Sequence, residues 1–248
     1  MIVIVGTNHD DILYFDSVLA NKREEAILGR YKISLGTIFN QEVIVVHELY
    51  TSSLASAVLT YILDRFFVDL VVNVGKCISV NNDIKNCDIV ISNTIIDTNV
   101  DLTLYHDVTI GEIPGFERVF NIQKDIVDYM IKGLERRTFV NFHHCTVLSC
   151  DNLSYEMREI LKSKKTIFGI KDEKLVLDQN SAGVALACSL KNVPFLTLKV
   201  VENRLEQESK IDTYVKVLAK YIDLGKAVVA TIGDIGRNDI LEGDEIHA

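Results

Sequence analysis

The chain has 248 residues, a hydrophobic content of 48% and a net charge of −9 at pH 7. This much apolar surface can offset the entropy lost on folding, which excludes an intrinsically disordered chain. The 35 acidic residues against 26 basic ones also exclude a protein that binds nucleic acid through a basic surface. The length is typical of one large α/β domain, so we expect a single domain over residues 1–240 and a frayed acidic tail at 241–248.

The mean hydropathy is positive, at +0.18, but no apolar stretch is long enough for a membrane helix. A spanning helix needs about 20 consecutive apolar residues, whereas runs such as Ile2–Val5 and Leu70–Val74 are short. The N-terminus lacks the basic segment and cleavage site of a secretory signal, so the sequence predicts a cytoplasmic protein without a membrane partner. The five cysteines are scattered without C-x-x-C spacing, which predicts reduced thiols and no metal site.

Strand and helix patterns alternate along the first half of the chain. Runs of β-branched residues predict strands, and apolar residues at helical spacing predict helices. We expect a strand at Ile2–Val5, a helix at Asp10–Leu19, a hairpin of Tyr31–Phe39 and Glu42–His47, a helix at Ser52–Phe67, strands at Leu70–Val74 and Asp88–Ile91, and a long loop with some extended structure at Asn93–Gly115.

The second half continues the alternation. We expect a helix at Asn121–Arg136, strands at Thr146–Ser149, Thr166–Ile170 and Phe195–Val201, and further helices at Tyr155–Leu161, Asn180–Leu190 and Ile211–Leu224. The pattern leaves Lys226–Ile232 open between strand and helix. Because strands that are apolar throughout are buried on both faces, the chain is predicted to form an α/β fold with a central twisted, mostly parallel mixed β-sheet flanked by helices.

Ligands of such sheets bind at the carboxyl ends of the strands, so the residues there are the candidates for a site. After the first strand comes Gly6–Asp11, which lacks the G-x-G-x-x-G fingerprint of a dinucleotide site. Asp10 and Asp11 would also suit the positive end of the following helix without any catalytic role. Amide side chains recur at the other strand ends, and amides form hydrogen bonds but do not transfer protons.

Five segments follow one another in an order that is typical of one family. They are Val68–Gly75, Cys87–Ser92, Asp101–Thr103 with Gly111–Gly115, Leu148–Asp151 and Asn192–Phe195. In this order they resemble the nucleoside phosphorylase and nucleosidase superfamily, in particular the branch that hydrolyses 5′-methylthioadenosine and S-adenosylhomocysteine. The resemblance covers nearly the whole chain. It implies the family's three-layer architecture, a purine nucleoside as substrate, no cofactor and a homo-oligomer, most simply a dimer.

The resemblance also implies catalytic roles for residues after the first and last predicted strands and ahead of the helix Asn180–Leu190. Asp11 falls where the family has the carboxylate that activates water, one methylene shorter than the usual Glu. Asn180 stands in place of the Glu that clamps the ribose hydroxyls. Asn203 stands in place of the Asp that protonates the purine, and its neighbour Glu202 would substitute for that acid only if the strand end bends, because on a regular strand it points away.

Further residues are implied to bind the substrate. Lys76 and Cys77 replace small residues near the ribose, and Leu153 replaces the aromatic residue that stacks on the base. The implied substrate-binding set is Lys76, Cys77, Asn152, Leu153, Asp178, Gln179 and Asn180. Lys76 is a candidate for binding an anion, although a solvated loop lysine is the better explanation.

Three functional hypotheses follow. The first is a nucleosidase with weak or altered activity, with Asp11 as the base and Asn203 or Glu202 at the leaving base; phosphorolysis is disfavoured because no glycine-rich turn with a nearby Arg follows the first strand. The second is a catalytically inactive relative that binds a nucleoside or serves as a subunit. The third is an unrelated α/β binding protein. The helix Ser52–Phe67 is a candidate interface, or ordinary core.

Overall fold

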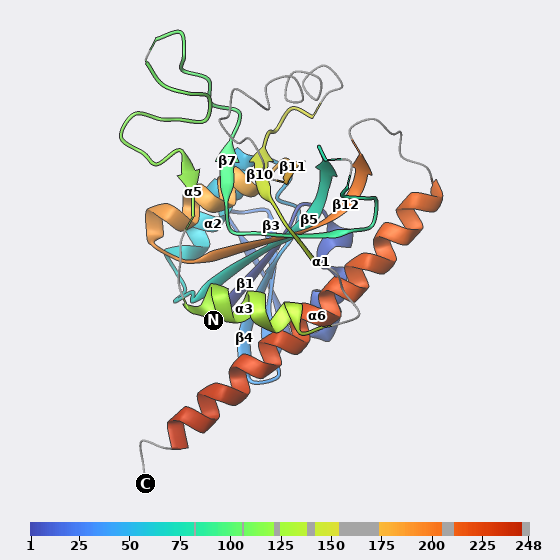
Figure 1. The fold of residues 1–248 in the computed structure, drawn as a ribbon. Coiled ribbons are helices and arrows are strands. Elements are labelled where there is room, and N and C mark those ends of the chain that lie inside the picture. Colours follow the sequence, from blue (N-terminus) through green and yellow to red (C-terminus); the bar gives the residue numbers. More distant parts are fainter. Residues whose placement is uncertain are drawn as a thin grey trace.

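The computed structural model describes residues 1–81, 83–105, 107–121, 125–137, 142–153, 174–204 and 211–244. The helices are α1 (His9–Val18), α2 (Ser52–Leu63), α3 (Asp125–Glu135), α5 (Ser181–Lys191) and α6 (Ile211–Asp244) (Figure 1). The strands are β1 (Ile2–Gly6), β2 (Ala20–Ile27), β3 (Tyr31–Ile38), β4 (Gln41–Val46), β5 (Leu70–Ser79), β6 (Ile89–Ser92), β7 (Ile95–Asp97), β8 (Val119–Phe120), β9 (Phe142–His144), β10 (Thr146–Ser149), β11 (Leu175–Asp178) and β12 (Phe195–Arg204).

The strands form one mixed sheet in which β5 is the central strand and pairs with β1, β11 and β12. The order is β2-β3-β4-β1-β5-β11-β10-β7-β8, and β12 pairs with both β5 and β6. β5 runs parallel to β1 and β12, and its last residues pair antiparallel with β11. The carboxyl ends of β1, β5 and β12 therefore meet at one place. The predicted fold class, an α/β fold with a largely parallel mixed sheet, is confirmed.

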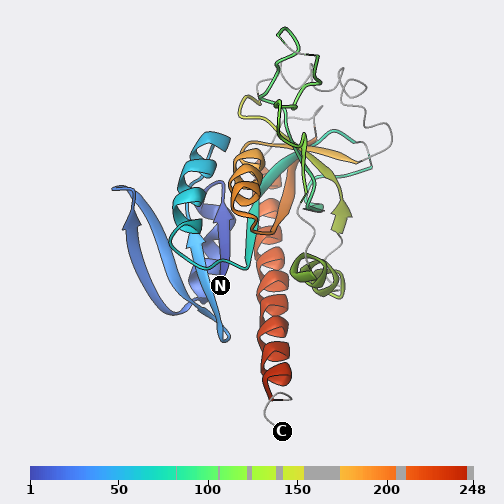
Figure 2. The ribbon, with the colours of Figure 1, turned by 90° about the vertical axis from the view of Figure 1, so that its left-hand side faces the viewer.

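Helices cover the sheet on both faces. Alternate residues of β1 point to opposite sides, so that Val3 packs toward α2 and α5 while Ile4 packs toward α1, α3 and α6. This alternation explains why the central strands are apolar throughout. Figures 1 and 2 show that α6 runs along its face of the sheet and continues beyond it. Within the described residues, no helix has the length and apolar character that crossing a membrane requires.

The expected helices and strands are present wherever the structure describes them, with shifted ends and several additions. α6 includes Lys226–Ile232, which settles that segment as helix, and extends to Asp244, into the stretch that was expected to be frayed. β2, β8, β9 and β11 were not anticipated. The expected helix at Tyr155–Leu161 and strand at Thr166–Ile170 lie outside the described residues.

Candidate active site

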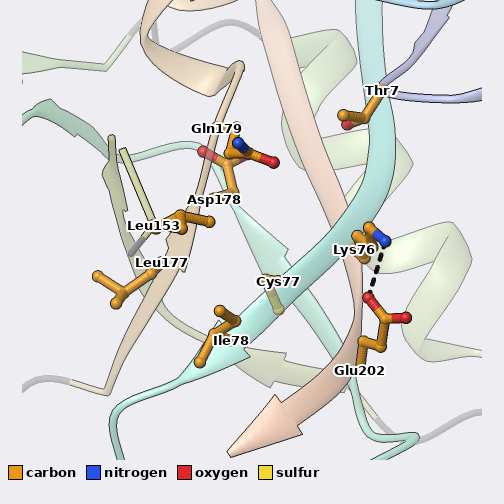
Figure 3. Close-up of a pocket in the computed structure, with 9 residues that line it drawn as sticks. All are labelled: Thr7, Lys76, Cys77, Ile78, Leu153, Leu177, Asp178, Gln179 and Glu202. Carbon is orange, nitrogen blue, oxygen red and sulfur yellow. Dashed lines mark ion pairs between the residues drawn. The ribbon is translucent and has the colours of Figure 1, made fainter. Parts of the chain in front are cut away.

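A cavity of about 180 Å³ opens at the carboxyl ends of β5, β11 and β12. Its lining residues are Thr7, Lys76, Cys77, Ile78, Leu153, Leu177, Asp178, Gln179 and Glu202 (Figure 3). The parallel pairing of β1, β5 and β12 brings these distant segments together, because each contributes the residues at or just beyond its end.

Asp11 lies in the first turn of α1, next to this cavity's Thr7, and is only 2% exposed. Asn8 caps the helix: its side chain accepts a hydrogen bond from the Asp11 backbone, and the Asn8 backbone donates to Oδ2 of Asp11 at 2.9 Å. Oδ1 of Asp11 has no hydrogen-bond partner among the described residues, and nor does the Tyr221 hydroxyl that approaches it from α6. One carboxylate oxygen is thus fixed by the helix end, and the Tyr221 hydroxyl lies close enough to the carboxylate to lower its pKa.

Burial controls the chemistry of Asp11. Loss of solvation raises the pKa of its carboxyl above the usual value, although the hydrogen bond from Asn8 and the positive charge of Lys199 oppose this effect. A raised pKa makes the carboxylate a better proton acceptor near neutral pH. Asp11 therefore has the basicity that activation of a water molecule requires.

Lys199 is a fully buried lysine in the middle of β12, and the sequence analysis did not single it out. Its ammonium donates to Asp178 at 2.9 Å, to the side-chain oxygen of Asn180 at 2.9 Å and to that of Asn73 at 3.3 Å. A buried charge is tolerated only when it is paired and hydrogen-bonded in this way. Lys199 and Asp178 therefore form a neutralised pair that holds Asn180 in place.

Gly75 on β5 is the point where these groups converge. A Cβ atom there would stand 2.6 Å from the Thr7 hydroxyl, 3.1 Å from the Lys199 ammonium and 3.3 Å from Oδ2 of Asp11. Only a residue without a side chain leaves room for this approach. The side-chain nitrogen of Asn180, which is also fully buried, has no partner among the described residues. Asp11 and Asn180 thus lie next to residues of the cavity lining, Asp11 near Thr7 and Asn180 directly after Gln179.

Lys76 and Glu202 form an ion pair at 2.9 Å on one wall of the cavity (Figure 3). The sequence made the direction of Glu202 depend on whether the end of this strand bends, and β12 is indeed irregular there. Val201 pairs with Cys77 and Asn203 with Ile78, so the register shifts by one residue at Glu202. Such a bulge re-aims side chains at a strand end, and here Glu202 faces the cavity.

Apolar side chains line the cavity across from this ion pair. Figure 3 shows Leu153 and Leu177 opposite Lys76 and Glu202, with Ile78 toward one end. Burial raises the pKa of the nearby Cys77 thiol well above its usual range, so the sulfur stays protonated and unreactive. An apolar wall facing a charged edge suits a flat heteroaromatic ring, whose faces are apolar and whose edge carries donors and acceptors.

The chain matches the model of the Phosphorylase superfamily over residues 1–232. It belongs to this superfamily. Among relatives of the superfamily, the 5′-methylthioadenosine/S-adenosylhomocysteine nucleosidase of Bacillus pumilus is 22% identical over 210 residues, which cover 85% of this chain and 88% of that protein. The hypothesis of an unrelated α/β binding protein is therefore wrong.

Solved nucleosidases have the same superfamily fold. The enzyme of Colwellia psychrerythraea, in complex with adenine, superposes with a TM-score of 0.80 at 20% identity and covers 94% of each chain. That of Campylobacter jejuni gives a TM-score of 0.82 at 14% identity and covers 93% of this chain and 97% of its own. At these identities the likeness establishes the fold.

Most of the candidate site residues inferred from the sequence gather around this cavity. Lys76, Cys77, Leu153, Asp178, Gln179 and Glu202 line the cavity, and Asp11 and Asn180 lie behind it. Asn152 is exposed and does not line the cavity. The Asn203 backbone pairs with Ile78, while its side chain lies outside what the structure describes.

The sequence analysis missed Lys199, Asn73 and Thr7. Lys199 had a detectable signal, because a single lysine inside the apolar run Phe195–Val201 must find a buried partner. Asn73 is likewise a polar residue within an apolar strand. In the part of the chain that the structure describes, no three His, Cys, Asp or Glu side chains gather as metal ligands.

Proposed function

We propose that the chain hydrolyses the N-glycosidic bond of purine nucleosides of the 5′-methylthioadenosine and S-adenosylhomocysteine type. Asp11 carries this proposal, as a buried carboxylate with a raised pKa that lies close to Gly75 and to Thr7 of the cavity lining. It would take a proton from the attacking water as the water oxygen bonds to C1′ and the base leaves. Membership of the superfamily and its likeness to nucleosidases support this reaction class.

The charged wall of the cavity supports an adenine base. Lys76 offers a donor next to the acceptor of Glu202, and their charged atoms are 2.9 Å apart. The edge of adenine has the matching order, with N7 as acceptor beside the N6 amino group as donor, whereas guanine has two acceptors there. The base would then lie against Leu153 and Leu177.

Asn180 would hydrogen-bond a ribose hydroxyl through its free side-chain nitrogen. Its oxygen is already occupied by Lys199, so the amide is oriented with the NH₂ group available. A neutral amide binds a hydroxyl less strongly than a carboxylate does. We therefore propose slow turnover or an altered specificity for the sugar.

The proposal is tested by incubating the protein with 5′-methylthioadenosine and with S-adenosylhomocysteine and measuring free adenine by chromatography. We expect adenine from at least one substrate, and a loss of about 10²–10⁴-fold in Asp11→Asn, as befits the removal of a general base. Equal adenine release by the wild type and Asp11→Asn would contradict the role of Asp11.

A catalytically inactive nucleoside-binding homologue is the second candidate. It is favoured by the amide at Asn180 and by the pairing of Glu202 with Lys76, in which the carboxylate accepts and does not donate. Calorimetry distinguishes the two candidates. If adenine or methylthioadenosine binds and no adenine is released, the chain is the catalytically inactive nucleoside-binding homologue.

We also propose a homodimer. Large apolar side chains are exposed on the loop between β7 and β8, with Leu104 82% and Tyr105 77% exposed, and a second copy would cover apolar surface of this kind. The buried face of α2 instead packs in the core against α5, so α2 is not required as an interface. Light scattering at a mass of two chains supports the dimer, and a monomer mass contradicts it.

A further inference from the structure

The side chains that line the cavity differ in whether they can supply a proton to a leaving base. Asp178 and Glu202 are carboxylates in ion pairs, and an ionised carboxylate only accepts hydrogen bonds. Burial keeps the Cys77 thiol protonated, and neither the Thr7 hydroxyl nor the Gln179 amide is acidic. Of the polar groups in this described lining, Lys76 remains, as an ammonium with three N–H donors.

We propose that Lys76 is the general acid of the site, a role that rests on the nucleosidase function proposed above. An ordinary lysine is protonated at neutral pH, and the departing base becomes basic as it takes the electron pair of the C1′–N bond. Transfer from an ammonium is less efficient than transfer from an acid matched to neutral pH. Lys76 thereby supplies a proton at a slower rate than a matched acid would.

The position of Lys76 suits this role. It directly follows Gly75, where Thr7, Lys199 and Asp11 converge. The proton donor Lys76 and the proton acceptor Asp11 therefore lie on either side of one short piece of β5. Glu202 fixes the direction of the ammonium by accepting one of its N–H groups at 2.9 Å. Two N–H groups remain for the purine base of the substrate, whose face would lie against Leu153 across the cavity (Figure 3). Glu202 is thus a positioning residue for Lys76.

The step balances without any added reagent. The C1′–N bond breaks with its electron pair going to the base, and Nζ of Lys76 gives one proton to a ring nitrogen of that base. The water oxygen bonds to C1′ and one of its protons goes to Asp11. Asp11 then releases its proton to solvent and Lys76 regains one from solvent, so the net reaction is nucleoside plus water to base plus free sugar.

Lys76→Arg tests this role, because arginine keeps the positive charge and a partner for Glu202 but does not give up its proton. Two substrates are compared: 5′-methylthioadenosine, whose base needs protonation, and a 4-nitrophenyl riboside, whose nitrophenolate leaves without it. We expect Lys76→Arg to slow adenine release by about 10²-fold or more, as for the loss of a general acid, and nitrophenolate release to stay within an order of magnitude of the wild type.

Lys191→Arg is the matched control, because Lys191 is also paired with a carboxylate, Asp64, but on the surface. It should leave both rates unchanged. Wild-type adenine release by Lys76→Arg would overturn the acid role while the nucleosidase function stands. An equal slowing of both substrates would also overturn it, because Lys76 would then act in binding or folding. If the wild type releases a product from neither substrate, the nucleosidase proposal fails and the acid role fails with it.

Discussion

The carboxyl group of Asp11 is buried deep in the fold. Burial raises its pKa, so the folded protein binds this proton more tightly than the unfolded chain does. The resulting cost to stability is absent at low pH and fully present once the pH exceeds the raised pKa of the folded state. The base role proposed for Asp11 would explain a residue that weakens the fold at neutral pH.

Asp11→Asn should separate the two effects. Its amide oxygen can still accept the hydrogen bond from Asn8, so the helix start is kept, while the buried charge is removed. The stability of the wild type relative to the variant should decline as the pH rises through the raised pKa of Asp11. Denaturant unfolding at several pH values measures this difference, and a difference that does not depend on pH would contradict the raised pKa.

A second prediction at the scale of single residues concerns the buried ion pair of Lys199. Lys199→Met leaves Asp178 buried without its counter-ion, a change that costs about 3–5 kcal/mol of unfolding free energy. The double variant Lys199→Met with Asp178→Asn should recover most of that loss, because the remaining partner is then neutral. Chemical denaturation measures both variants, and equal losses in the single and the double variant would exclude the charge as the cause.

Glu202→Gln tests recognition of the base. The variant replaces the carboxylate that we propose accepts from the adenine amino group by an amide that offers both a donor and an acceptor. Preference for methylthioadenosine over methylthioinosine should fall by about 1–3 kcal/mol, the value of a matched donor–acceptor contact with a base edge. The ratio of kcat/KM for the two substrates measures this preference, and an unchanged ratio would show that Glu202 does not face the base.

At the scale of elements, continuous apolar runs made the central strands predictable, while the bulge in β12 was not. Side-chain alternation along Phe195–Val201 says nothing about where the register shifts, so the direction of Glu202 could be stated only conditionally. β2 was missed because most of its residues are exposed and it carries charged residues in place of an apolar pattern. β11 was missed because four residues directly before a helix give too short a signal.

The contact between α5 and α2 gives a prediction at this scale. A Cβ on Gly183 would stand 1.8 Å from the backbone oxygen of Ser52, so α5 approaches the start of α2 as closely as two backbones allow. Gly183→Ala would gain about 1 kcal/mol in helix propensity, but the clash with backbone should outweigh this gain by about 1–3 kcal/mol. Thermal unfolding measures the net effect.

Leu190→Ala on the same helix is the control, since Leu190 is 58% exposed and its loss should change stability little. A Gly183→Ala protein as stable as the wild type would contradict the close contact. Because the Ser52 hydroxyl also donates to the backbone of Gln179 in the cavity wall, the variant should lower activity as well.

At the scale of the whole molecule, the arrangement is that of the superfamily, with a polar site that differs from the pattern the sequence resembles. A mostly parallel sheet was predictable from the apolar runs, but the pairing of particular strands was not. The parallel pairing of β1, β5 and β12 explains why residues as distant as Asp11 and Glu202 lie near one cavity. The buried charges were not predictable in the same way, because the partner of Lys199 depends on tertiary packing. The net charge of −9 is a property of the whole chain. It does not reveal the balance of charge at the cavity, where Lys76 and Lys199 each pair with a carboxylate.

The central claim is that this site splits a nucleoside with water. The most direct measurement incubates the protein with 5′-methylthioadenosine in water labelled with heavy oxygen, with phosphate present, and identifies the products by mass spectrometry. We expect free adenine and methylthioribose that carries one heavy oxygen at C1. A sugar phosphate, or a nucleoside that binds and stays intact, would contradict the account.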